Sequence, residues 1–347
     1  MNATALLAVV LVQAPDTAVD QIPLISSGPV RAVTSTLAAV APHIDGSDTD
    51  DVWRSAVVIS EFREFQPVED KDPRFRTEAM VAHDARNFYV FVRALDPAPD
   101  SIETLLARRD TRAPTDQIKI VIDSYHDRRT GYEFAVNPAG VKRDYAIYND
   151  QREDVNWDAV WEVATQVDSV GWTAEFRIPL SQLRFVPSES NTFGFGVWRD
   201  IERYTERVSW PLYRVSQPGV SSQLGEVNGL DGLAPPRRLE LSPYTVAKSV
   251  PRATANGLNQ QQEITAGADV KYGLTSNLTF TATVNPDFGQ VEADPGVLNL
   301  SAFETFFSER RPFFVEGRGL FEFDIYCSAV NCGGEGLFYS RRIGRAP

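Results

Sequence analysis

The sequence predicts an all-β protein, in which an antiparallel β-sandwich of jelly-roll type is followed by a second antiparallel sheet. From His43 to about Tyr213, short runs rich in Val, Ile, Phe and Tyr recur with turn signals between them, as in "NFYVFVRALD" and "GWTAEFRIPL". Such spacing is typical of sandwiches. After Pro235 and Pro236 the chain changes to longer stretches in which polar and apolar residues alternate. The 347 residues suffice for two domains of this kind.

Two of the early runs alternate regularly enough for their faces to be assigned, because successive side chains of a strand point to opposite sides of a sheet. One face of the first run carries Phe88, Val90, Val92 and Ala94, with Tyr89, Phe91 and Arg93 opposite; in the second run Ile118, Ile120 and Ile122 alternate with Lys119 and Val121. We therefore expect each sheet to bury one face. Helical patterning is scarce, and Ile102–Asp110, capped by Ser101, is the best candidate for a short helix.

The two ends of the chain carry features of an exported protein. Residues 1–14 contain an apolar run, Leu6–Val12, followed by small residues, which predicts a signal peptide. Residues 15–42 have small residues and prolines without a period, which predicts a linker. Near the other end, Cys327 and Cys332 lie without the further Cys or His pair of a zinc site. A loop-closing disulfide is favoured there, with two free thiols as the alternative.

The net charge of −13 limits the classes of partner. Nucleic acids and anionic lipid surfaces are bound by clustered Lys and Arg, so an acidic chain argues against both. Sugars, cations and neutral partners remain compatible with this charge.

The most regular alternation lies in Ile264–Val284. Apolar residues occupy every second position from Ile264 to Tyr272 and again from Leu278 to Val284, with a turn between. This hairpin fits a soluble sheet with one wet face, which the pattern alone favours. It also fits transmembrane β-strands, which run about 9–11 residues. Two strands cannot close a barrel, so the second interpretation requires that the sequence is a piece of a longer protein.

Several segments resemble known bacterial families. "HIDGSDTDD", "VWRSA", "TEAMVAHDARNFYVFVRALD", "WDAVWEVAT" and "GWTAEFRIPLSQLRF" resemble the family 9 carbohydrate-binding module as it occurs in bacterial surface proteins. "NPDFGQVEADPGVLNLSAFETFFSERRPFFVEGRGLFEF" and "FYSRRIGR" resemble the start of an uncharacterised outer-membrane barrel domain that follows such a module in many Gram-negative proteins. The resemblance implies a sandwich over residues 43–230 and the first strands of an incomplete outer-membrane β-barrel over 237–347. The hairpin would then belong to the barrel.

Sugar binding needs flat apolar faces for the C–H side of a pyranose, with charged or amide groups at the edge for its hydroxyls. The candidates cluster around "NWDAVWE" and the aromatic turn before it, and they are Trp157, Trp161, Tyr125, Tyr132 and Asp158. The alternative for each tryptophan is a place in the core. Family 9 modules use a pair of aromatic residues around a terminal sugar, but that pair does not map onto this sequence.

The loop "DGSDTDD" is the candidate metal site. It brings Asp45, Asp48 and Asp50 close together in sequence, and carboxylates suit a hard cation such as calcium. The loop lacks the EF-hand order of ligands, and a solvated acidic turn is the favoured alternative. A structural calcium ion, which the family 9 resemblance also implies, is the single cofactor considered.

Catalytic motifs are scarce. His43, His83 and His126 are scattered, and His83 and His126 are expected at the surface. Neither H-E-x-x-H nor G-x-S-x-G occurs. A phenylalanine-rich segment, residues 303–317, could be an exposed partner-binding patch, whereas the resemblance favours a plug at the barrel mouth.

These observations predict a non-enzymatic protein of the cell envelope. The sandwich would recognise a glycan or envelope polysaccharide, and the barrel would anchor or transport at the outer membrane of a Gram-negative bacterium. One alternative is the binding module of a polysaccharide-degrading glycoside hydrolase system. Another is a structural interaction domain without a sugar site.

Overall fold

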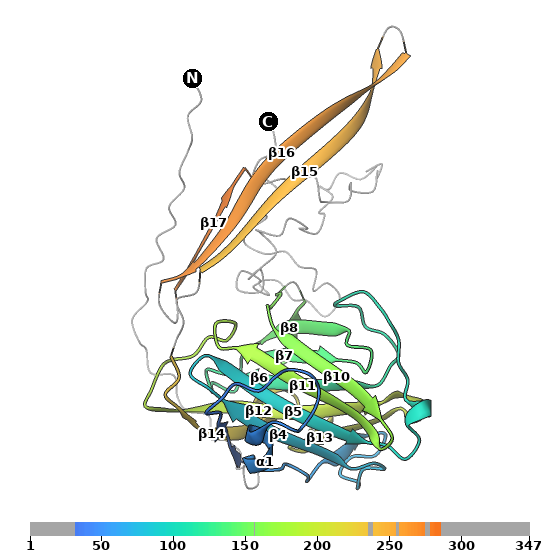
Figure 1. Cartoon of the computed structure of the whole chain (residues 1–347), viewed down its shortest axis with the longest axis vertical. Coiled ribbons are helices and arrows are strands. Elements are labelled where there is room, and N and C mark those ends of the chain that lie inside the picture. Colours follow the sequence, from blue (N-terminus) through green and yellow to red (C-terminus); the bar gives the residue numbers. More distant parts are fainter. Residues whose placement is uncertain (1–31, 156, 235–238, 255–256, 275–277, 286–347) are drawn as a thin grey trace, which may run out of the picture. The chain divides into compact units, whose positions relative to one another are not determined.

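A computed structural model describes residues 32–155, 157–234, 239–254, 257–274 and 278–285. The protein is all-β, with two stacked sheets that form a β-sandwich and a separate three-stranded sheet (Figure 1). In this part of the chain no helix is long and apolar enough to cross a membrane. The predicted signal peptide, the two cysteines and the phenylalanine-rich segment lie outside the described residues.

The larger sheet of the sandwich has nine strands. Its path runs β1-β14-β12-β6-β7-β8-β9, while β13 pairs with β12 and with β3. The strands are β1 (Ala32–Thr34), β3 (Arg63–Gln66), β6 (Gln117–Asp123), β7 (Gly131–Val136), β8 (Lys142–Tyr148), β9 (Arg152–Asp154), β12 (Ser190–Ile201), β13 (Glu206–Trp210) and β14 (Gly225–Asp231).

The smaller sheet has five strands in the order β10-β11-β5-β4-β2. They are β2 (Thr36–Leu37), β4 (Thr77–His83), β5 (Asn87–Leu95), β10 (Glu162–Asp168) and β11 (Gly171–Pro179). The described helical elements are short: α1 (Asp51–Ser55) and the 3₁₀ turns η1 (Pro99–Ser101), η2 (Glu202–Tyr204) and η3 (Ser221–Gln223).

The main core lies between the two sheets. Phe88, Val90, Val92 and Ala94 of β5 are buried in it together with Ile118, Ile120 and Ile122 of β6. Both assigned inward faces are therefore confirmed. Apolar burial of this kind stabilises the fold by roughly 25 cal/mol for each Å² removed from water.

The expectation that each sheet buries one face is wrong. On β5, Tyr89 and Phe91 are also fully buried. Trp53 of α1 packs against Phe91 with the ring centroids 5.7 Å apart, and both belong to a second apolar cluster. On the larger sheet, Val121 and Trp198 belong to a third cluster. Alternation separates two faces of a strand, but it does not say whether a remote segment covers the second one.

The helix expected over Ile102–Asp110 does not form. Its backbone groups bond to neighbouring strands and loops: the carbonyl of Glu103 accepts the N–H of Asp116 at 3.1 Å, and the N–H of Asp110 donates to the carbonyl of Lys142 at 3.1 Å. Groups engaged in this way cannot take part in a helical hydrogen-bond ladder, so tertiary pairing overrides the local preference.

Part of the expected linker is structured. Residues 32–37 form β1 and β2, which pair in parallel with β14 and β4. Strands of three and two residues are too short to show a period in the sequence. Between them, Ser35 Oγ lies 2.8 Å from Nδ1 of His83. His83 is 1% exposed, not a surface residue as expected, and its burial lowers the pKa of the imidazole.

The segment between β13 and β14 covers the outer face of the larger sheet. Tyr213 from this segment packs edge-on against Phe65, with centroids 5.4 Å apart, and lies 6.2 Å from Trp198. Residues far apart in sequence therefore close the third apolar cluster.

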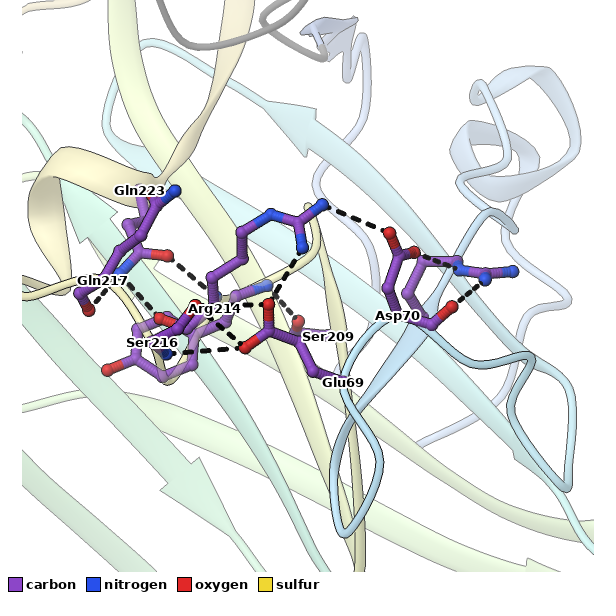
Figure 2. A network of polar contacts seen from close by, with 9 residues as sticks. Glu69, Asp70, Ser209, Arg214, Ser216, Gln217 and Gln223 are labelled. Carbon is purple, nitrogen blue, oxygen red and sulfur yellow. Dashed lines mark hydrogen bonds and ion pairs between the residues drawn. The ribbon is translucent and has the colours of Figure 1, made fainter. Parts of the chain in front are cut away.

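Figure 2 shows the polar contacts that tie this covering segment to the loop after β3. Arg214 donates to Glu69 at 2.9 Å and to Asp70 at 3.2 Å. These hydrogen bonds lower the pKa of both carboxyls. Gln223 accepts the N–H of Arg214 at 2.8 Å and donates to the carbonyl of Gln217 at 3.1 Å. The network orders the segment over the sheet.

The second sheet consists of β15 (Leu239–Thr254), β16 (Gly257–Gly273) and β17 (Thr279–Val284), all antiparallel. The predicted hairpin is confirmed by the pairing of β16 with β17. At Gly267 a Cβ atom would lie 2.5 Å from the ring of Tyr244, so glycine there leaves space for the cross-strand aromatic ring.

The register of this sheet gathers apolar residues on one face. Leu239 is opposite Tyr272, which is opposite Phe280, and Leu241, Val270 and Ala282 form the next row. The large apolar side chains of this face that remain exposed are Leu239 67%, Leu241 63%, Ile264 74%, Phe280 53% and Val284 64%. The opposite face carries polar residues, among them Glu240 and Lys271, whose charged groups lie 4.0 Å apart.

Candidate functional site

Asp144 on β8 positions the predicted tryptophan segment. Its buried carboxylate accepts the N–H of Ala159 at 2.6 Å, Nε1–H of Trp161 at 3.3 Å and a guanidinium N–H of Arg109 at 2.7 Å. A buried carboxylate is tolerated when it is paired and hydrogen-bonded. These bonds therefore fix the segment before β10 against the first half of β8.

Trp161 belongs to the core. It is 2% exposed and stacks on Phe176 with centroids 5.8 Å apart and an interplanar angle of 7°. Phe134 meets it edge-on at 5.4 Å. This is the alternative that the sequence left open for Trp161, and the ring is not accessible to a ligand.

Trp157 lies at the surface of the same cluster. Its ring packs on Tyr132 of β7, with centroids 4.7 Å apart and an interplanar angle of 37°, and both side chains are half-buried. Val155 and Val160, on either side of it in the chain, are 64% and 68% exposed. Trp157 and Tyr132 thus form a supported aromatic pair next to exposed apolar surface.

The residue after Trp157, Asp158, belongs to a charged pair. The guanidinium of Arg109 contacts the carboxylate of Asp158, whose side chain is 72% exposed, and donates to the carbonyl of Ala159 at 2.9 Å. Burial lowers the pKa of Arg109, but the hydrogen bond and charge of Asp144 outweigh it and raise the pKa overall. Arg109 therefore stays cationic beside Asp158.

The other predicted ligand residue is Tyr125. It lies half-buried in the turn between β6 and β7, the turn that leads into Tyr132. The structure therefore brings Tyr132, Trp157 and Asp158 together at the surface and places Trp161 beneath them.

Sequence reasoning missed Arg109 and Asp144. They are 35 residues apart, and Arg109 is 49 residues from Asp158. No local motif joins them, because their contact depends on how the loop after β5 lies beside β8. The single available signal was the group of charged residues in "ARRD", which forms the end of the predicted helix and carries no spacing information about Asp144.

The acidic loop is anchored to Glu175 of β11. The N–H groups of Asp45 and Gly46 donate to one carboxylate oxygen of Glu175 at 3.0 and 2.9 Å, and Nε1–H of Trp53 donates to the other at 2.9 Å. Gly46 has φ +85°, a conformation that favours glycine. Burial raises the pKa of Glu175.

The predicted calcium ligands have separate partners in this loop. Asp45 accepts the N–H of Ser47 at 2.8 Å, Asp50 accepts the N–H of His43 at 3.0 Å, and Asp48 lies 3.9 Å from Arg93. Among the residues that the structure describes, no group of three or more His, Cys, Asp or Glu side chains could hold a metal ion. In this structure the three aspartates are therefore not gathered into a carboxylate cluster, and the calcium site stays a prediction.

A second aromatic cluster lies where β4 begins and β12 ends. Tyr204, 43% exposed, has the guanidinium of Arg74 4.2 Å and that of Arg203 5.0 Å from its ring centroid. Two guanidinium groups therefore lie over this ring. Nearby, burial raises the pKa of Asp116 to about 6.

Residues 44–209 match the family model described as "Carbohydrate family 9 binding domain-like". This part of the chain is CBM9-like. Residues 235–347 match a different family model, described as "Domain of unknown function (DUF5916)". A comparison with curated proteins found no match.

Solved structures similar to this chain are distant in sequence. A family 9 carbohydrate-binding module from Caldicellulosiruptor kristjanssonii in complex with cellotriose has 17% identity and a TM-score of 0.41, covering 57% of this chain and 92% of its own. A Bacteroides uniformis protein, named for carbohydrate binding, has 14% identity and a TM-score of 0.45, covering 58% and 99%. The assignment of residues 44–209 as a CBM9-like domain rests on the family model and not on these structures.

Proposed function

We propose that the CBM9-like domain binds a glycan on the surface formed by Trp157 and Tyr132. The observation that carries this proposal is the aromatic pair itself: Trp157 packs on Tyr132 at 4.7 Å and is held in place by a segment bonded to buried Asp144. A ring that is already ordered loses little entropy when a sugar packs on it.

The charged pair of Asp158 and Arg109 suits the same ligand class. Hydroxyl groups both donate and accept, and Asp158, which follows Trp157 in the chain, and its ion-pair partner Arg109 offer a carboxylate acceptor and guanidinium donors. The acidic charge of the whole chain is compatible with a neutral glycan. The similar Caldicellulosiruptor module was solved with cellotriose and with glucose, so short glucans are the first ligands to test.

The test is affinity electrophoresis and titration calorimetry against a panel of cello-oligosaccharides and bacterial envelope polysaccharides. We expect Trp157→Ala to lower affinity about tenfold or more, because the platform for the sugar face is lost. Tyr204→Ala is the matched control, since it removes an exposed aromatic ring from the other cluster. A protein that binds nothing on the panel, or a folded Trp157→Ala variant that binds as tightly as the parent, overturns the proposal.

We further propose that the three-stranded sheet begins a β-barrel that anchors the protein in the outer membrane of a Gram-negative bacterium. The observation that favours this is the exposed apolar face of β15, β16 and β17, which stands opposite a polar face with Glu240 and Lys271. Transmembrane strands alternate in this way, with one face toward lipid and the other toward a polar lumen. Recovery of the natural gene product at its full length in washed outer membranes tests the proposal, and its recovery solely in the soluble fraction overturns the proposal.

A further inference from the structure

We infer that, if the sheet spans the outer membrane as proposed above, the CBM9-like domain faces the periplasm and the distal end of the β15–β16 hairpin projects outside the cell. The inference rests on the membrane proposal. It depends on the lengths of the paired segments, on the turn between β16 and β17, and on the position at which the chain enters the sheet.

The apolar face has the length of one bilayer crossing. Its apolar positions run over residues 239–247 of β15 and 264–272 of β16, which are paired with each other. Nine residues of antiparallel strand span about 30 Å, and a tilt of about 40° reduces this to roughly 23 Å along the membrane normal. That agrees with the apolar band of outer-membrane barrels, about 25 Å tall.

Aromatic residues mark one border of this band. Tyr272 is directly opposite Phe280, and Tyr272 also pairs with Leu239, the first residue of β15. Aromatic side chains gather where barrel strands meet the membrane interface. We call this end of the sheet the proximal border.

The connections at the two ends of the band differ in length. At the proximal border the chain turns from Gly273 to Thr279 within a few residues, with the N–H of Leu274 bonded to the carbonyl of Leu278 at 2.9 Å. At the distal end the hairpin continues as a paired ribbon from Lys248 and Glu263 to Thr254 and Gly257. The sequence of this extension is polar, with "NQQQ" at residues 259–262.

This asymmetry indicates the orientation. In bacterial outer-membrane barrels the periplasmic turns are short and the extracellular connections are longer. The proximal border is therefore periplasmic and the ribbon is external. A polar ribbon cannot remain in hydrocarbon, where each unsatisfied polar group costs several kcal/mol.

The CBM9-like domain must lie on the proximal side. Its sandwich ends with β14 at Asp231, and β15 begins at Leu239. To reach the distal side, the intervening residues 232–238 would have to cross the hydrocarbon as unpaired backbone, which a bilayer does not tolerate. The glycan-binding surface would therefore meet periplasmic polysaccharide or material that has already crossed the outer membrane.

Single cysteines labelled with a membrane-impermeant maleimide test this orientation. The natural gene product at its full length carries Cys327→Ser and Cys332→Ser, and each variant is expressed in a Gram-negative host. Asn259→Cys probes the ribbon, where it pairs with Arg252. Leu274→Cys probes the proximal turn, and Glu189→Cys probes the exposed surface of the sandwich.

We expect Asn259→Cys to be labelled on intact cells, and we expect the labels at positions 274 and 189 to be lost unless the outer membrane is permeabilised. Ala268→Cys, near the middle of the band, is the lipid-face control and should be protected in both conditions. Labelling of position 189 on intact cells, or of position 259 solely after permeabilisation, in a protein recovered from membranes overturns the orientation and leaves the membrane proposal standing. A protein recovered solely in the soluble fraction overturns both.

An epitope inserted after Glu189 gives a second measurement that needs no cysteine substitution. Antibody binding to this epitope should require permeabilised cells. Binding to intact cells contradicts the inference.

Discussion

Strands of the sandwich and of the three-stranded sheet share the same alternating pattern, but the two regions differ in how their faces are covered. On β5 of the sandwich, Phe88 packs into the main core and Phe91 packs under Trp53, so both faces are covered. On β16 the apolar face leaves Ile264 74% exposed. Alternation in the sequence therefore shows that the two faces of a strand differ in polarity. Whether a face is covered depends on segments elsewhere in the chain or on the surroundings of the protein.

The largest expected difference in stability is between alanine variants of a core and a surface tryptophan in the same segment of the sandwich. Trp161→Ala should lower the free energy of unfolding by about 4 kcal/mol, because it leaves a cavity among Phe134 and Phe176. Trp157→Ala should cost much less, since that ring is half-buried. Urea unfolding of both variants measures the difference, and equal losses would contradict the placement of one ring in the core and one at the surface.

A charge placed on the apolar face of the three-stranded sheet should destabilise the protein in the membrane by slightly less than Trp161→Ala destabilises the sandwich. Ala268→Lys lies near the middle of the band, and a lysine at the bilayer midplane costs about 3 kcal/mol in barrel strands. We expect reduced recovery in the outer membrane. Ser242→Lys is the control, because it places the same charge on the opposite face beside Asp269. If the two variants are recovered equally, lipid does not cover this face.

The covered outer face of the smaller sheet depends on Glu175. Glu175→Ala removes the acceptor for the N–H groups of Asp45 and Gly46 and for Trp53, and should cost about 2 kcal/mol in thermal or urea unfolding. Glu162→Ala, the same change at a surface carboxylate paired with Arg177, should have a small effect. Similar effects for the two variants would show that the anchoring of α1 does not depend on this carboxylate.

The smallest expected effect is a dependence on pH. Burial raises the pKa of Asp116 from 3.8 to about 6. The stability that this group contributes is therefore fully present below pH 4 and is lost as the pH rises through about 6. Asp116→Asn should be more stable than the parent at pH 7.5, by less than the roughly 3 kcal/mol that a shift of about two pKa units represents, and equal to it near pH 4.

Thermal unfolding between pH 4 and 8 measures this difference. Asp100→Asn, which removes an exposed carboxylate, controls for the loss of one negative charge. If the gap between Asp116→Asn and the parent does not change with pH, burial of the ionised form is not what limits stability here.

The sequence predicted the part of the fold that depends on local periodicity. The inward faces of β5 and β6 and the pairing of β16 with β17 follow from alternation over seven or more residues in the runs that contain them. It did not predict β1 and β2, or the loss of the helix at Ile102–Asp110. These depend on hydrogen bonds to β14, β4 and Lys142, which lie far away in the chain.

For the candidate site, the sequence by itself determined which residue types were present: aromatic rings at Tyr132, Trp157 and Trp161 and a carboxylate at Asp158. Only the tertiary structure decided which of the rings is accessible. Asp144 bonds the segment to β8, so that Trp161 is buried in the core while Trp157 stays at the surface. Likewise, the sequence placed three aspartates in one loop, but in the structure each has a different partner: the N–H of Ser47 for Asp45, the N–H of His43 for Asp50 and the guanidinium of Arg93 for Asp48. The sequence gives the chemical type of each residue directly. Which side chains are buried, and which come together at one site, is set by contacts between residues distant in the chain.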